Sequence, residues 1–130
     1  MNKDSLSLTR NEWAVMEALW RAPATLMELV HALSREMGWA KSTTTTMIRR
    51  MEDKGLIRHE AGGRAKLFYP VIDREQAALA ETHTLLDKAF GGSVGLMVST
   101  LVQQNSLSRS DIDALYDILR RAEDGTEKEV

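Results

Sequence analysis

The chain has 130 residues, of which 43% are hydrophobic and 28% charged, and it contains no cysteine. This composition is globular, the length fits one domain or a small domain with an appendage, and the lack of thiols excludes disulfides and zinc–cysteine sites. No segment approaches the about 18 consecutive apolar residues of a membrane span, and residues 1–10 lack the apolar core of a signal peptide. We therefore expect a cytoplasmic protein without membrane insertion.

The net charge of −2 conceals an uneven distribution along the chain. Residues 1–72 contain 11 Lys or Arg and 8 Asp or Glu, a net charge of +3, whereas residues 73–130 contain 6 and 11, a net charge of −5. A basic first half suits a polyanionic partner, and an acidic second half does not. We expect two domains with different tasks, residues 1–72 and residues 73–130.

Two capping boxes predict where the first helices begin. Thr9 with Glu12, and Thr25 with Glu28, each place a hydroxyl three residues before a carboxylate, and apolar residues follow at helical spacing. Residues 21–24 separate the two helices, because proline lies among them.

After a third predicted helix, residues 41–54, the pattern changes to strands. Residues 56–60 and 66–71 flank a glycine-containing turn, residues 61–65, and so predict a β-hairpin in which Pro70 limits the second strand to an edge or its end. Three helices followed by a hairpin is the order of a winged helix-turn-helix domain, whose third helix enters the DNA major groove. The same order also occurs in protein-docking modules.

The third helix is predicted to have two unlike faces. At about 100° per residue its apolar side chains and one threonine share a stripe, and hydroxyls and arginines occupy the opposite side. Hydroxyls and arginines bond to base edges and phosphates, and threonine methyls contact thymine methyls. The predicted base-reading residues are Ser42, Thr43, Thr45, Thr46 and Arg50. A linker is the competing interpretation, because consecutive threonines form helices poorly.

Phosphate contacts are expected from cations on this helix and on the hairpin, the wing of the predicted fold. They are Lys41, Arg49, Arg64 and Lys66, with Arg50 also placed to reach phosphate. Gly62 and Gly63 would let the turn approach the duplex closely, although a solvated turn is the alternative. The histidines are scattered and no catalytic motif is present, so we expect neither an enzyme nor a cofactor or metal site.

The second half predicts helices that need a partner. Residues 73–90, residues 94–102 and a helix capped by Ser108 are expected, with a frayed tail from Glu123. So short a segment cannot bury its many apolar residues alone. A second copy is the simplest cover, and its symmetry would align two winged helices on a palindrome. Packing of these helices against their own first half is the alternative.

Several segments resemble the penicillinase-repressor family of BlaI, MecI and CopY. They are Leu8–Trp20, Lys41–Thr45, Arg50–Ile57, Gly63–Pro70, Phe90–Gly92 and Leu107–Ser108. The resemblance implies a mainly α fold with a small β-hairpin, in which a winged helix-turn-helix domain precedes a helical dimerisation domain. It also implies a homodimeric repressor of palindromic promoter operators, with a membrane-associated sensor or protease as a further partner.

Two departures limit what the resemblance implies. The cysteines with which CopY-type members sense copper are absent. The Asn-Phe dipeptide at which β-lactam repressors are cleaved is absent from the matching segment, where Ser99, Thr100 and Leu101 remain as a candidate proteolysis region. The leading hypothesis is a homodimeric transcriptional repressor, and the alternatives are a winged-helix docking module and a small-molecule-responsive regulator of the same fold.

Overall fold

The computed structural model describes residues 7–129, with side chains up to residue 125. This part of the chain divides into two compact units, which meet in the sequence between Leu85 and Leu86. Residues 1–6 and residue 130 lie outside the description, and most of the segment to which the expectation for residues 1–10 applies therefore lies outside it as well.

The first unit is a winged helix. Its elements are α1 (Arg10–Arg21), β1 (Ala24–Thr25), α2 (Leu26–Met37), α3 (Lys41–Asp53), β2 (Ile57–Gly62), β3 (Ala65–Pro70) and the beginning of α4 (Arg74–Phe90). Both predicted capping boxes are present, with Glu12 N donating to Thr9 Oγ1 over 3.1 Å and Glu28 N donating to Thr25 Oγ1 over 3.2 Å. The first two helices therefore begin within a residue of where the sequence predicts, and α3 begins at Lys41, also as predicted.

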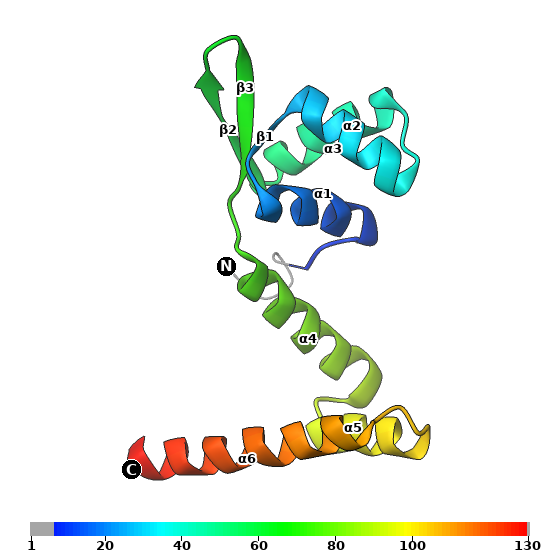
Figure 1. Ribbon diagram of the computed structural model, residues 1–130, viewed down its shortest axis with the longest axis vertical. Coiled ribbons are helices and arrows are strands. Elements are labelled where there is room, and N and C mark those ends of the chain that lie inside the picture. Colours follow the sequence, from blue (N-terminus) through cyan, green and yellow to red (C-terminus); the bar gives the residue numbers. More distant parts are fainter. Residues whose placement is uncertain (1–6, 130) are drawn as a thin grey trace. The chain divides into compact units, whose positions relative to one another are not determined.

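The sheet has three antiparallel strands in the order β1, β3, β2, and its hairpin projects beyond the neighbouring helices (Figure 1). The third strand, β1, was not predicted, because two residues carry no periodic signal. Pairing continues out to Gly62 with Ala65, so the turn is only Gly63 and Arg64, shorter than the predicted loop. Gly63 has φ of +72°, the conformation that glycine supplies at the first position of a type II′ turn. Pro70 is the last residue of β3, as expected.

The core of this unit is formed by α1, α2 and α3 together with the sheet and the start of α4. Met16, Leu33, Met51 and Ala77 are completely buried, and Phe68 of β3 packs with them. Because α3 contributes Thr44, Ile48 and Met51 to the buried side, its opposite side is presented outward.

The second unit contains the end of α4 and two further helices, α5 (Val94–Gln103) and α6 (Arg109–Glu129). Ser108 and Asp111 cap α6 reciprocally, as predicted. The backbone of α6 is helical to Glu129, which corrects the expected fraying from Glu123, because neither proline nor a left-handed glycine interrupts the segment. None of the described side chains of α5 or α6 is buried.

Within the described residues, no single helix combines the length and the apolarity that a membrane crossing requires.

Candidate nucleic-acid interface

The exposed face of α3 carries the predicted base-reading residues. Ser42, Thr43, Thr45 and Arg50 are exposed and Thr46 is partly exposed, whereas Thr44, Ile48 and Met51 are buried. The segment is thus a helix and not a linker. The propensity cost of its threonines is offset by tertiary packing of the apolar stripe, which is the usual source of helix stability in proteins.

Two threonine hydroxyls on α3 have different environments. Thr45 Oγ1 donates to Lys41 O over 2.9 Å, so its methyl group and an oxygen lone pair remain for a ligand. Thr44 Oγ1 is buried and has no hydrogen-bond partner among the described residues. The helical periodicity of the sequence correctly predicted that Thr44 lies on the buried face of α3.

The N-terminus of α3 differs from those of α1 and α2. Threonine side chains cap α1 and α2, but the N-cap of α3 is Ala40, whose side chain accepts no hydrogen bond, and its first turn contains no acidic residue. The first N–H groups of α3 are therefore left for water or an anion, with Lys41 beside them. This feature was missed in the sequence, although alanine at the cap position would have indicated it.

The cations of the predicted interface are unpaired. In the part of the chain whose side chains are described, Lys41, Arg49, Arg50, Arg64 and Lys66 form no ion pair. By contrast, most arginines elsewhere do, and the pair of Arg21 with Glu36 is an example at 2.7 Å. Unpaired cations on one exposed helix face and the adjacent hairpin turn are what a phosphate backbone requires.

A link between α3 and the wing was also missed. Glu52, one turn after Arg49, pairs with His59 Nδ1 of β2, and the His59 ring lies edge-on to Phe68 with centroids 5.8 Å apart. This contact connects the last turn of α3 to the wing. No signal in the sequence connects these residues, since only the fold brings them together.

The wing presents its turn residues to solvent. Arg64 and Lys66 are exposed, and neither Gly62 at the end of β2 nor Gly63 in the turn has a side chain that would obstruct an approaching backbone. Lower on the same hairpin, the Arg58 guanidinium lies 4.5 Å from the centre of the Tyr69 ring and pairs with Glu60, which keeps this third cation on the hairpin surface.

The candidate proteolysis region lies in α5. Ser99 and Leu101 are exposed, and Thr100 is partly exposed with its Oγ1 donating to Leu96 O over 2.8 Å. All three residues are helical, so their peptide bonds are held in helical hydrogen bonds.

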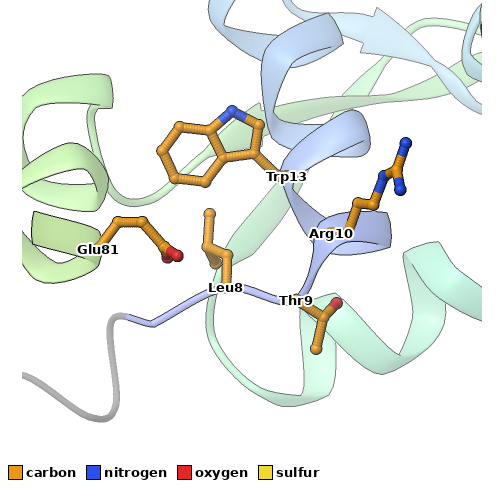
Figure 2. A pocket seen from close by; sticks show the side chains of 5 residues that line it. All are labelled: Leu8, Thr9, Arg10, Trp13 and Glu81. Carbon is orange, nitrogen blue, oxygen red and sulfur yellow. The ribbon is translucent and has the colours of Figure 1, made fainter. Parts of the chain in front are cut away.

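A pocket of about 290 Å³ lies between the start of α1 and α4. Leu8, Trp13 and Glu81 line it and converge in Figure 2, whereas the Arg10 side chain is directed away from Glu81. Its volume is at the lower limit for a small-molecule site, and the two charged side chains of its lining, Arg10 and Glu81, are directed apart. The pocket therefore does not supply the convergent polar groups that an effector site needs.

Comparison with known proteins decides the family. The family model described as penicillinase repressor matches residues 8–121. The chain belongs to the penicillinase repressor family. As a member it is a winged-helix DNA-binding repressor and not an enzyme, and the resemblance noted from its motifs is confirmed.

Individual relatives are similar over most of their length. A penicillinase repressor of Bacillus licheniformis is 29% identical over 109 residues, covering 83% of this chain and 85% of the relative. A penicillinase repressor of Staphylococcus aureus is 22% identical over 120 residues, covering 92% and 95%. The solved DNA-binding domain of the repressor BlaI is 26% identical, with a TM-score of 0.45 over 58% of this chain and 85% of that one. A mutant MarR from E. coli, solved in complex with operator DNA, is 19% identical, with a TM-score of 0.47 over 92% and 79%.

Proposed function

We propose that this repressor acts as a homodimer on palindromic promoter operators and blocks transcription by occupying them. The observation that carries the proposal is the exposed hydroxyl and cation face of α3, held by a buried apolar stripe. Ser42, Thr43, Thr45, Thr46 and Arg50 read base edges, while Lys41, Arg49, Arg64 and Lys66 contact phosphates. Such a protein works in the cytoplasm, where its operators are.

The dimer is supported by the apolar surface of the second unit. Leu96, Val102, Ile118 and Leu119 are each more than half exposed, and a shared groove runs between α5 and α6. So many large apolar side chains exceed the single exposed residues of an ordinary monomer surface. A second copy that covers them with the same face on both partners is the simplest occupant.

Relief of repression is assigned to α5 in the same proposal. A membrane-associated sensor or protease would cut at Ser99, Thr100 or Leu101, after α5 unwinds enough to present an extended backbone. Limited proteolysis of the full chain checks this step. Cleavage confined to α5 supports this step, whereas cleavage only in the loops outside α5 contradicts it.

The DNA proposal is tested by selecting duplexes from a random pool with the full chain and measuring their binding by fluorescence anisotropy. We expect a palindromic consensus with half-sites about 10 base pairs apart or a multiple of that. Affinity should fall steeply between 50 and 200 mM salt, by about 10³-fold if six phosphates are contacted. If the selection enriches no sequence and all duplexes bind weakly, the result would favour a protein-docking module instead.

A further inference from the structure

The chain leaves the winged helix through an anchored segment. Ile72, which is buried, accepts a hydrogen bond on its carbonyl oxygen from Trp20 Nε1 of α1 over 2.9 Å. The two residues are 52 positions apart in the sequence. This contact ties the backbone immediately before α4 to the last turn of α1.

The first residue of α4 is held by a second set of contacts. Arg74 pairs with Glu17 of α1, and its guanidinium lies 5.6 Å from the centre of the Trp20 ring. Trp13 Nε1 donates to the same Glu17 oxygen over 3.0 Å, and its ring meets that of Trp20 edge-on at 5.5 Å. The hydrogen bond from Arg74 lowers the pKa of the Glu17 carboxyl, so this carboxylate is ionised at neutral pH.

The contacts between Glu17, Trp20, Ile72 and Arg74 are termed the α4 clamp. One turn beyond it, Ala77 is completely buried in the core, so the first turns of α4 pack with the winged helix. The helix then continues without a break to Phe90, past the division between the two units. The division between the two units therefore falls within a continuous helix.

Stability alone does not account for the clamp. The Arg74 side chain is 58% exposed and the Glu17 side chain 35% exposed, so water reaches the ion pair. Exposed ion pairs change stability little. Their geometric effect is larger, because two side chains of α1, Glu17 and Trp20, contact the backbone and the side chain at the point where α4 begins.

We propose that the α4 clamp sets the direction in which α4 leaves the winged helix and thereby the half-site spacing that the dimer accepts. The proposal rests on the proposed function, and Glu17, Trp20 and Arg74 are positioning residues in it. A dimer joined by flexible tethers binds half-sites over a range of separations, whereas stiff connections favour one separation.

The experiment compares Arg74→Met with Arg21→Met in the full chain. Methionine retains the aliphatic stem and removes the ion pair. Arg21, the last residue of α1, is a matched control, because its side chain is exposed by 59%, close to the 58% of Arg74, and pairs with a carboxylate, Glu36, within the winged helix. Each variant is titrated with a duplex bearing one half-site, with the selected palindrome, and with palindromes whose spacing is changed by one, two or five base pairs. Sedimentation velocity confirms that both variants have the oligomeric state of the wild type.

For Arg74→Met we expect unchanged half-site affinity, about tenfold weaker binding of the selected palindrome, and a flatter dependence on spacing. Arg74→Lys keeps the positive charge but lacks the planar guanidinium, so it should retain part of the spacing preference. Trp20→Phe removes the N–H donor to Ile72 O and should weaken the spacing preference. An unchanged spacing preference in Arg74→Met, or equal losses on half-site and palindrome, overturns the proposal. If the wild type binds no duplex specifically, the proposed function fails first, so the two failures are distinguishable.

Discussion

Lys54 Nζ lies 2.6 Å from Glu12 Oε2, and this ion pair joins the C-cap of α3 to the first turn of α1. The other oxygen of the same carboxylate accepts a hydrogen bond from Thr9 N over 2.9 Å, which completes the capping box. Glu12 is 4% exposed. One buried carboxylate therefore stabilises the start of α1 and holds the end of the helix that is proposed to read DNA.

Removing the cation of this pair should destabilise the fold. We expect Lys54→Met to lower the free energy of unfolding by about 1–3 kcal/mol, because Glu12 then keeps a buried charge with fewer partners. Urea denaturation followed by circular dichroism measures the change. Arg58→Met is the control, since both side chains of its pair with Glu60 are more than half exposed and the expected change is about 0–1 kcal/mol. Equal losses in the two variants would contradict a special role for Glu12.

The pH dependence of stability should report the ionisation of the same carboxylate, Glu12. Burial raises the pKa of Glu12, but hydrogen bonds from Lys54 and Thr9 N outweigh burial and leave the pKa below its ordinary value of 4.5. Because the pKa is lowered in the folded state, the stabilisation is complete well above 4.5 and is lost as the pH falls through the folded-state pKa. The stability difference between wild type and Glu12→Gln should therefore be constant near neutral pH and shrink in acid. A stability difference that grows on acidification would contradict a lowered pKa of Glu12 in the folded state.

The basic face of α3 should act on binding and not on folding. We expect Arg50→Ala to weaken operator binding by about 1–3 kcal/mol, if Arg50 contacts a base, with little change in thermal stability. Arg49→Ala should weaken all duplexes alike and reduce the salt slope by about one, as for a phosphate contact. Arg120→Ala is the control, because Arg120 is also exposed and unpaired among the described residues but lies on α6. If Arg50→Ala binds like this control, Arg50 is not in the interface.

The buried hydroxyl of α3 predicts a stabilising substitution. Thr44→Val replaces an unpartnered buried oxygen by a methyl group of similar size, and we expect stability to rise by about 1 kcal/mol. Operator affinity should stay unchanged, since Thr44 is completely buried. Thr45→Val, on the exposed face of the same helix, should instead reduce affinity and leave stability nearly unchanged. Thermal unfolding and anisotropy titrations separate the two, and loss of binding in Thr44→Val would place its hydroxyl in the interface.

The apolar face of the second unit predicts how the oligomer can be dissociated. Leu119 is 60% exposed on α6 beside Tyr116, which lines the same groove. A charge there would be desolvated in a dimer, so we expect Leu119→Asp to sediment as a monomer at micromolar concentration. Arg120→Asp, one residue along, should leave the wild-type oligomer intact. A wild-type chain that is itself monomeric would refute the dimer.

Local signals in the sequence predicted much of the winged helix. Each capping box is contained within four residues, and the buried stripe of α3 follows from a 3.6-residue period, so neither needs the tertiary structure. Strand β1 could not be predicted, because Ala24 and Thr25 become a strand only by pairing with Phe68 and Leu67 of β3. The hairpin turn was predicted too long, because strand pairing next to glycine depends on the partner strand.

The sequence by itself determined which face of α3 is polar, which cations lie on it, and where most helices begin, since these depend on residues a few positions apart. Only the tertiary structure decided that Glu52 is directed to His59, that Lys54 reaches Glu12, and that Trp20 and Glu17 hold the start of α4. These pairs are separated by 7 to 57 residues. No local propensity encodes them, because such contacts form only where the packing of the whole core brings the elements together.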